Sequence, residues 1–254
     1  MAVTVLTPSF APDYLTKHFL QCLSSAFLIR GPTMTRKPAT TPRLAYKGES
    51  GAPLPPHDRF SGAIVSGSAA MVTDRLDWSE RTAAWLHDAA HAGFPLMGIC
   101  YGHQLLAHAL GGEAGDNPDG RCMGTIEVEL HAAAARDRLF SGLPQRFAAH
   151  ATHMQIALRL PDEAVALAQA THDPFHAFRW RDNAWGVQFH PEFSAAHMRG
   201  YLRARADVLR AEGQDPQALL RAVRPAPVAR RVLRRFARLA RTLADPPGTN
   251  GVDR

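Results

Sequence analysis

The sequence predicts an α/β fold: a three-layer sandwich with a mainly parallel central sheet and a helical extension at its C-terminal end. Three observations lead to this prediction. Short apolar runs alternate with amphipathic helical segments between about residues 43 and 199. Several of these runs end in glycine-containing loops, as buried strands of parallel sheets do. Beyond residue 200 the apolar residues recur at helical spacing only.

The first 42 residues allow two interpretations. In the first, residues 2–6 form the first strand and residues 13–25 form the helix that follows it. In the second, residues 27–30 form the first strand, which leaves little room for a helix after it. Residues 33–42 are polar and rich in threonine and proline, which predicts a loop. The N-terminal part, residues 1–42, is therefore atypical of the pattern that follows.

Two strand–helix units come next. Residues 60–68 predict a strand that ends in a loop of small residues, and residues 77–92 predict a helix closed by Gly93. Residues 94–99 predict a second buried strand, and residues 101–110 a helix that is stopped by two glycines.

The following segment is richer in strands. Residues 125–130 alternate between apolar and acidic side chains, which predicts a half-exposed strand, and residues 164–168 form a further candidate. Residues 177–180 and 184–190 flank a polar Arg-Asp-Asn turn and predict a hairpin. We expect antiparallel strands from this segment to extend the parallel sheet.

Beyond Glu192 the chain is predicted to be helical, over residues 195–212, 216–223 and 228–243. The last helix has an apolar stripe along one face, and arginines occupy most of its remaining surface. The stripe consists of Val228, Val232, Phe236, Leu239 and Leu243.

Charge divides the chain at about residue 200. The net charge of the whole chain is +6, but residues 201–254 hold 12 Arg against 5 Asp and Glu, whereas residues 1–200 carry a net charge of −1. We therefore expect one domain over residues 1–200 and an Arg-rich helical extension over residues 201–254. The extension is expected to be an amphipathic helix packed on the body or on another subunit, with its arginines in solvent.

Composition excludes several classes of protein. With 46% hydrophobic and 20% charged residues the chain is neither disordered nor collagen-like, and its 3 cysteines do not form a disulfide scaffold. No apolar run approaches the length of a membrane span, and residues 1–16 lack the basic residues of a secretory signal. The sequence predicts a cytoplasmic protein.

The first chemical motif is Gly-Ile-Cys-Tyr-Gly at residues 98–102, between a predicted strand and a predicted helix. This is the thiol counterpart of the serine nucleophile elbow. A sharp strand-to-helix turn holds Cys100 in a strained conformation, and the flanking glycines leave room for it. The helix N-terminus lowers the pKa of a thiol there and offers N–H groups to an oxyanion.

The second motif, Gly-Val-Gln-Phe-His-Pro-Glu at residues 186–192, lies 90 residues after the cysteine. His190 follows an apolar strand, so it lies at the edge of the sheet where ligands bind. Glu192 is two residues further on and can hold the imidazole tautomer. Each motif alone has a structural explanation, as a buried cysteine or a strand exit, but both in this order predict nucleophilic catalysis.

Residues 95–105 and 186–192 together resemble the two signature blocks of class I glutamine amidotransferases, and most closely those of the glutaminase domain of GMP synthase and its stand-alone relatives. The resemblance covers roughly residues 43–199. It implies a flavodoxin-like fold and a catalytic triad of Cys100, His190 and Glu192. On this analogy the cysteine attacks the side-chain amide of glutamine and forms a γ-glutamyl thioester.

The resemblance also implies an oxyanion site and a substrate site. The oxyanion would be bound by backbone N–H groups of Tyr101 and of the loop at Gly67 and Ser68, although the family reads Ser-Gly-Gly-Pro where this chain reads Ser-Gly-Ser-Ala. Gln104 would contact glutamine, or be an ordinary helix residue. The backbone of Thr152 and His153 would bind the α-amino and α-carboxylate groups, or be a polar loop.

His103 belongs to the motif without an assigned role and is expected to be structural. No metal cluster or cofactor site is evident in the sequence. No ATP site is evident either, because no glycine-rich phosphate loop follows residue 200.

Three hypotheses for function remain open. The first is a glutamine amidotransferase-like hydrolase that supplies ammonia to a partner synthase. The second is a stand-alone hydrolase of another γ-glutamyl amide or peptide. The third is a non-catalytic binding or regulatory protein whose Arg-rich extension contacts RNA, DNA or acidic surfaces.

Overall fold

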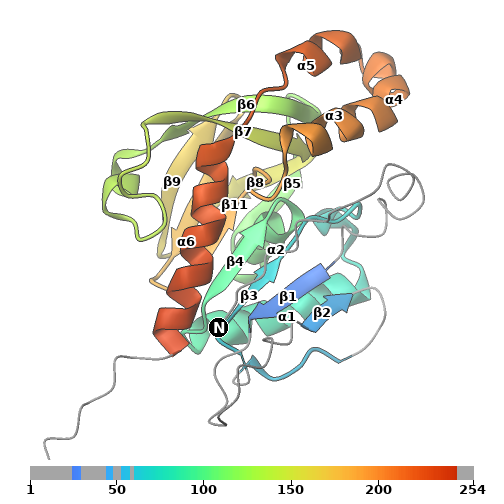
Figure 1. Ribbon diagram of the computed structural model, residues 1–254. Helices are drawn as coiled ribbons and strands as arrows, with labels where there is room; N and C mark the ends of the chain where they lie inside the picture. The colour runs from blue at the N-terminus through green and yellow to red at the C-terminus, as the bar shows by residue number, and fades with distance from the viewer. Residues whose placement is uncertain (1–24, 30–43, 48–52, 58–59, 245–254) are drawn as a thin grey trace, which may run out of the picture.

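Helices cover both faces of one large sheet in the computed structural model, which describes residues 25–29, 44–47, 53–57 and 60–244 (Figure 1). The predicted α/β class is confirmed. The predicted strand at residues 2–6, the body of the predicted helix at 13–25 and the loop at 33–42 lie outside the described residues.

The large sheet has nine strands in the order β2-β1-β3-β4-β11-β10-β9-β6-β7. Its strands are β1 (Ser25–Ile29), β2 (Leu44–Lys47), β3 (Gly62–Val65), β4 (Leu96–Ile99), β6 (Cys122–Leu130), β7 (Arg146–His153), β9 (Ala164–Ala170), β10 (Asp173–Trp180) and β11 (Ala184–Val187). A second, two-stranded sheet pairs β5 (Glu113–Asp116) with β8 (Gln155–Arg159).

The centre of the large sheet is parallel. Strand β4 pairs in parallel with β3 on one side and β11 on the other, and antiparallel strands extend the sheet in both directions. The hairpin predicted around residues 181–183 is present as β10 and β11. The strand predicted at residues 27–30 corresponds to β1, which runs antiparallel to β3.

The helices are α1 (Asp77–His91), α2 (Tyr101–Ala109), α3 (Ala195–Ala204), α4 (Ala206–Ala211), α5 (Pro216–Ala222) and α6 (Pro227–Ala244), with 3-10 turns η4 (Val72–Asp74) and η5 (Ala132–Arg136). The single helix predicted over residues 195–212 is wrong. The chain leaves helical geometry at Arg205, where φ is −109° and ψ is 11°, and it continues as α4.

The sheet lies between two helical layers (Figure 1), and an apolar core fills the space on each of its faces. Leu96 and Val65 face a core shared with α1 and α2, whereas the neighbouring residue Met97 faces a core shared with α6. This alternation follows from the two-residue period of a strand. A smaller third core joins α3 and α5 to β6.

Helix α6 crosses the sheet face opposite α1 and α2. Val232 and Phe236 from the predicted stripe are fully buried, whereas Leu243 at its end is 39% exposed. A Cβ added at Gly62 of β3 would lie 2.8 Å from the Cβ of Ala240, so the helix and the strand approach closely. Among the residues described, no helix is both long and apolar enough to cross a bilayer.

Candidate active site

The elbow predicted around Cys100 is present between β4 and α2. Cys100 has φ 53° and ψ −107°, a strained left-handed conformation for a residue with a side chain. A Cβ at Gly98 would lie 2.2 Å from the carbonyl oxygen of Gly102, and one at Gly102 would lie 2.1 Å from that of Val65. Both glycines are therefore required by close approach of the backbone.

Cys100 follows β4 directly and contacts the ends of two other strands, β11 and β7. Its backbone N–H donates to the carbonyl oxygen of Val187 on β11 at 2.9 Å, which fixes the elbow beside the strand that leads to His190. Its Sγ lies 3.6 Å from the carbonyl oxygen of Thr152 at the end of β7. The residue is 6% exposed, so the thiol lies in a largely water-free setting.

His190 and Glu192 form the second half of the predicted triad. The Nδ1 atom of His190 lies 2.7 Å from Oε1 of Glu192, and His190 is 2% exposed. Burial alone lowers the pKa of this imidazole, but its interactions with Glu192 and Cys100 outweigh the effect of burial and raise the pKa to about 10. The imidazolium form of His190 is thus favoured beside Cys100.

The His190 ring is also held by its surroundings. Its backbone N–H donates to the carbonyl oxygen of His150 at 2.8 Å, and the Phe193 ring stacks on the imidazole with centroids 4.2 Å apart. Burial, with His190 nearby, lowers the pKa of His150 to about 4, so His150 stays neutral at pH 7. The bond to Glu192, the backbone bond to His150 and the stacking on Phe193 together hold the His190 ring in one orientation.

The loop expected to form the oxyanion site follows β3 directly. Neither Gly67 nor Ser68 has a positive φ, so serine fits the backbone found here, and the Ser68 hydroxyl accepts from the N–H of Ala70 at 3.1 Å. The contact of Gly102 with Val65 brings the start of α2, including Tyr101, beside the strand end from which this loop leaves.

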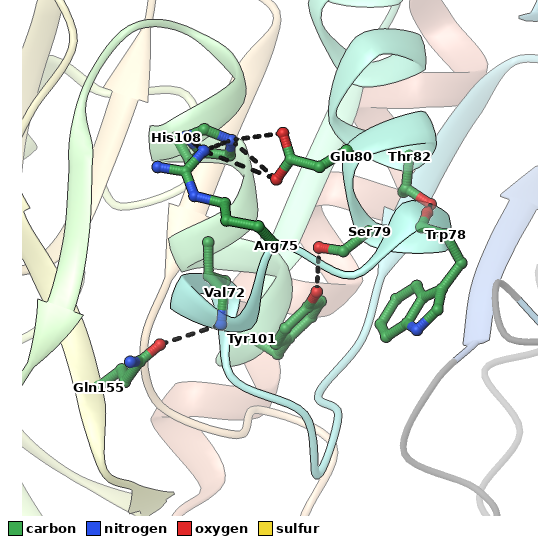
Figure 2. A network of polar contacts seen from close by, with 9 residues as sticks. All are labelled: Val72, Arg75, Trp78, Ser79, Glu80, Thr82, Tyr101, His108 and Gln155. Carbon is green, nitrogen blue, oxygen red and sulfur yellow. Dashed lines mark hydrogen bonds and ion pairs between the residues drawn. The ribbon is translucent and has the colours of Figure 1, made fainter.

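A polar network anchors the far end of this loop (Figure 2). The N–H of Val72 donates to Oε1 of Gln155 at 3.0 Å, and the hydroxyls of Tyr101 and Ser79 lie 2.5 Å apart. Arg75 lies 3.6 Å from Glu80 of α1 and 2.6 Å from His108 of α2. The loop is thus tied to α1, α2 and β8 rather than projecting freely.

The residues expected to bind substrate differ in their surroundings: Thr152 contacts Cys100, whereas the Gln104 and His153 side chains are bound to other protein groups. Gln104 is 4% exposed, and its Nε2 donates to the carbonyl oxygen of Gln155 at 2.5 Å and to Gln188 at 3.1 Å. Thr152 and His153 are the last residues of β7, where the sequence left a polar loop as an alternative. The His153 side chain points inward, with its Nδ1 lying 3.1 Å from the carbonyl oxygen of Gln155.

Several buried polar residues around the site were not predicted from the sequence. Gln155 joins η4, β5 and α2, and Gln188 accepts from Gln104. Asp173 and His176 form a buried pair behind His153. In the sequence, Asp173 precedes His176 by three residues. This spacing does not predict a buried pair, because it also occurs between exposed residues. His103, expected to be structural, is fully buried against Phe178.

The part of the chain that holds these residues is similar to known proteins. A family model described as "Glutamine amidotransferase class-I" matches residues 26–205. The GMP synthase of Aeropyrum pernix is 40% identical over 139 residues, which are 53% of this chain and 24% of that protein. A glutamine-hydrolysing GMP synthase subunit of Methanothermobacter thermautotrophicus is 37% identical over 99 residues, 39% of this chain and 51% of that protein.

A third relative has a different activity in its name. Gamma-glutamyl peptidase 4 of Arabidopsis thaliana is 26% identical over 139 residues, 54% of this chain and 55% of that protein. The chain thus spans between a quarter and about half of the length of these relatives. Among solved structures, a glutamine amidotransferase from Methylobacillus flagellatus has a TM-score of 0.58 at 26% identity, covering 77% of this chain and 79% of its own.

Proposed function

Because the chain belongs to the class I glutamine amidotransferase family, and is by that membership an amide hydrolase, we propose that it cleaves the side-chain amide of glutamine with a Cys100–His190–Glu192 triad. The observation that carries this proposal is the geometry of the triad. A strained, glycine-flanked Cys100 interacts electrostatically with the buried His190 imidazole, whose Nδ1 is 2.7 Å from a carboxylate oxygen of Glu192.

The first half of the reaction forms a thioester. The Cys100 thiolate attacks the amide carbon, and the negative charge that develops on the amide oxygen is stabilised by backbone N–H groups of Tyr101 and of Gly67 or Ser68. As the carbon–nitrogen bond breaks, His190 gives its proton to the departing ammonia. The pKa of His190, raised to about 10, supports this role because the imidazolium is populated at neutral pH.

The second half releases glutamate. Neutral His190 now removes a proton from water, which attacks the thioester carbon, and Cys100 leaves as the thiolate. Glu192 holds the imidazole through Nδ1 and stabilises its positive charge in both halves. Gln104 and the backbone of Thr152 and His153 are proposed to position the substrate, in keeping with the contact of Thr152 to the thiol.

Similarity to a GMP synthase subunit that is a separate chain supports a further step, in which the ammonia passes to a partner synthase. The domain division at about residue 200 is close to residue 205, where the match to the family model ends, and remains a proposal.

A second candidate is favoured by the similarity to a gamma-glutamyl peptidase. The same triad would then hydrolyse the γ-glutamyl amide bond of a larger compound, and no partner would be needed. The serine at position 68 and the alanine after it, in place of the family's glycine and proline, are the local differences that would accompany a changed substrate.

The test uses the purified protein with glutamine and a small set of γ-glutamyl amides and peptides, with ammonia, amine and glutamate as readouts. We expect Cys100→Ala to lower hydrolysis by at least about 10⁴-fold while leaving the fold intact. Normal glutamine hydrolysis by Cys100→Ala would overturn the mechanism. Preferential turnover of a bulkier γ-glutamyl compound would select the second candidate.

A further inference from the structure

Three buried side chains of the kinds that bind metal ions lie close together, and none of them belongs to the proposed triad. His153 ends β7, and Asp173 and His176 come from β10. They are 5%, 2% and 0% exposed, respectively. Each residue offers one potential ligand atom, and these three atoms lie within 4.8 Å of one another. Charged and polar groups this deeply buried need partners, so the completeness of their hydrogen bonds decides what the cluster can do.

The hydrogen bonds of the cluster are incomplete. His176 Nδ1 lies 2.6 Å from Asp173 Oδ2, and His153 Nδ1 lies 3.1 Å from the carbonyl oxygen of Gln155. The Nε2 atom of His153 is buried and lacks a hydrogen-bond partner among the described residues, so it is the nitrogen of this ring that remains for a ligand.

We propose that His153 Nε2, His176 Nδ1 and one oxygen of Asp173 bind a single zinc ion. Zinc then takes the place of the proton that His176 and Asp173 share. Two imidazole nitrogens and one carboxylate oxygen form a donor set that zinc accepts in tetrahedral geometry. The bond from His153 Nδ1 to the Gln155 carbonyl supplies the outer partner that a metal-bound histidine ordinarily has.

The geometry requires only small movements. Tetrahedral zinc with bonds of about 2.0–2.2 Å holds its ligands about 3.3 Å apart. Donors within 4.8 Å must therefore close by at most about 1.5 Å, and the 2.6 Å contact of Asp173 with His176 must open slightly.

The burial of the cluster favours zinc in a structural role. Magnesium and calcium prefer oxygen ligands only. Iron(II) sites with two histidines and one carboxylate keep several open positions for a co-substrate. Zinc needs only one further ligand, a single water molecule, to become four-coordinate beside side chains that are at most 5% exposed. A zinc ion here joins the end of β7 to β10. It thereby fixes Thr152, the neighbour of His153 whose carbonyl oxygen contacts Cys100.

The test measures zinc binding to the full chain in the Cys100→Ala background, because the nucleophile and His190 are a second place where zinc can bind. Metal-depleted protein is titrated with zinc by calorimetry, and cobalt(II) is used as a spectroscopic substitute. We expect one ion per chain, a visible cobalt spectrum typical of tetrahedral nitrogen and oxygen ligands, and a higher melting temperature with zinc.

Variants then assign the ligands. His176→Gln and the nearly isosteric Asp173→Asn are each expected to weaken zinc binding at least about 100-fold. The matched control is His150→Gln, which removes another buried histidine of the same strand outside the cluster and should leave binding unchanged. Circular dichroism of each variant checks its fold, and Asp173→Asn keeps the test valid if His176→Gln does not fold.

Three results would overturn the proposal. The first is no stoichiometric zinc binding by Cys100→Ala. The second is unchanged affinity in a folded Asp173→Asn or His176→Gln variant. The third is a cobalt–thiolate absorption band in the Cys100→Ala background, which would place the ion on another cysteine.

Discussion

Cys100 is held in a backbone conformation that costs a residue with a side chain about 1–3 kcal/mol. The contacts around it explain how that conformation persists. Gly98 and Gly102 let the elbow approach its neighbours closely, and the bond from the Cys100 N–H to Val187 fixes its position. Strain and close approach together place the thiol at the tip of the turn.

At the residue scale, Gly102 tests the close approach. Although alanine is the better helix former, Gly102→Ala is expected to destabilise the protein by about 1–3 kcal/mol and to impair hydrolysis, because its Cβ would collide with the Val65 carbonyl oxygen. The control is Gly200→Ala in α3, where nothing lies within 4 Å of the added Cβ. It should stabilise the protein by up to about 1 kcal/mol. Urea unfolding measures both, and equal effects would contradict this explanation.

The charge of His190 gives a second prediction. Removing the carboxylate in Glu192→Gln lowers the pKa of His190 from about 10, because burial is then opposed by Cys100 alone. The alkaline limb of kcat/KM, which reports loss of the imidazolium, should therefore move to lower pH. We expect Glu192→Gln to lower kcat about 10²-fold and His190→Ala at least about 10⁴-fold. Equal losses would show that Glu192 does more than orient the base.

The same group links stability to pH. A histidine whose pKa rises from 6.5 to about 10 on folding stabilises the protein fully below pH 6.5, and this contribution is lost as pH rises toward 10. Unfolding measurements at pH 6 and pH 9 should show a smaller decrease for Glu192→Gln than for the unchanged protein.

How much of the site could be predicted depends on the spacing of its residues. Cys100, His190 and Glu192 lie in two short motifs, so the sequence alone is enough to propose them as a triad. The pair of Asp173 and His176 meets His153 only because β10 and β7 fold into one neighbourhood. Such contacts arise from strand pairing over long sequence distances, which no local pattern encodes.

At the scale of elements, strands with a clear apolar pattern were predictable and others were not. The hairpin of β10 and β11 has a polar turn between apolar runs. Strand β7 contains three alanines and two histidines, and β5 contains glycine and two acidic residues, so neither has high strand propensity. Their partners, β6 and β8, hold them in the sheets.

Helix α6 permits a prediction about packing. Phe236→Ala should destabilise the protein by about 3–5 kcal/mol, because the fully buried ring packs against Trp185 in the core. Arg238→Ala, on the exposed face of the same helix, should change stability by no more than about 0.5 kcal/mol. Chemical unfolding compares them, and a small effect of Phe236→Ala would mean that α6 is not part of the cooperative core.

At the scale of the whole molecule, the positive charge of the chain lies on α6 and its neighbours, as the sequence predicts. The structure adds that the apolar side of α6 completes a core, while Arg235 donates to the carbonyl oxygens of Leu139 and Ser141 at 2.8 Å and 2.7 Å. Removing this segment to test nucleic-acid binding would therefore also remove part of the core.

Substitution of exposed arginines is the cleaner test. We expect RNA and DNA duplexes to bind no more tightly than the about 10⁻⁶ M of non-specific contacts. We expect replacement of Arg231, Arg234 and Arg238 by glutamine to remove what binding there is. Fluorescence anisotropy over a range of salt concentrations measures this. A tight, steeply salt-dependent complex that the triple variant loses would support the third hypothesis.

The position of α6 in the chain also affects how the protein is made. The last strand, β11, ends at Val187, but the helix that covers its apolar face ends only at Ala244. A ribosome that adds about 5–20 residues per second needs about 3–11 s for that interval. During this time all strands of the sheet have been synthesised, but the helix that covers one of its apolar faces has not. The nascent chain is then most exposed to aggregation and to chaperone binding, and each translational pause between β11 and α6 prolongs that exposure.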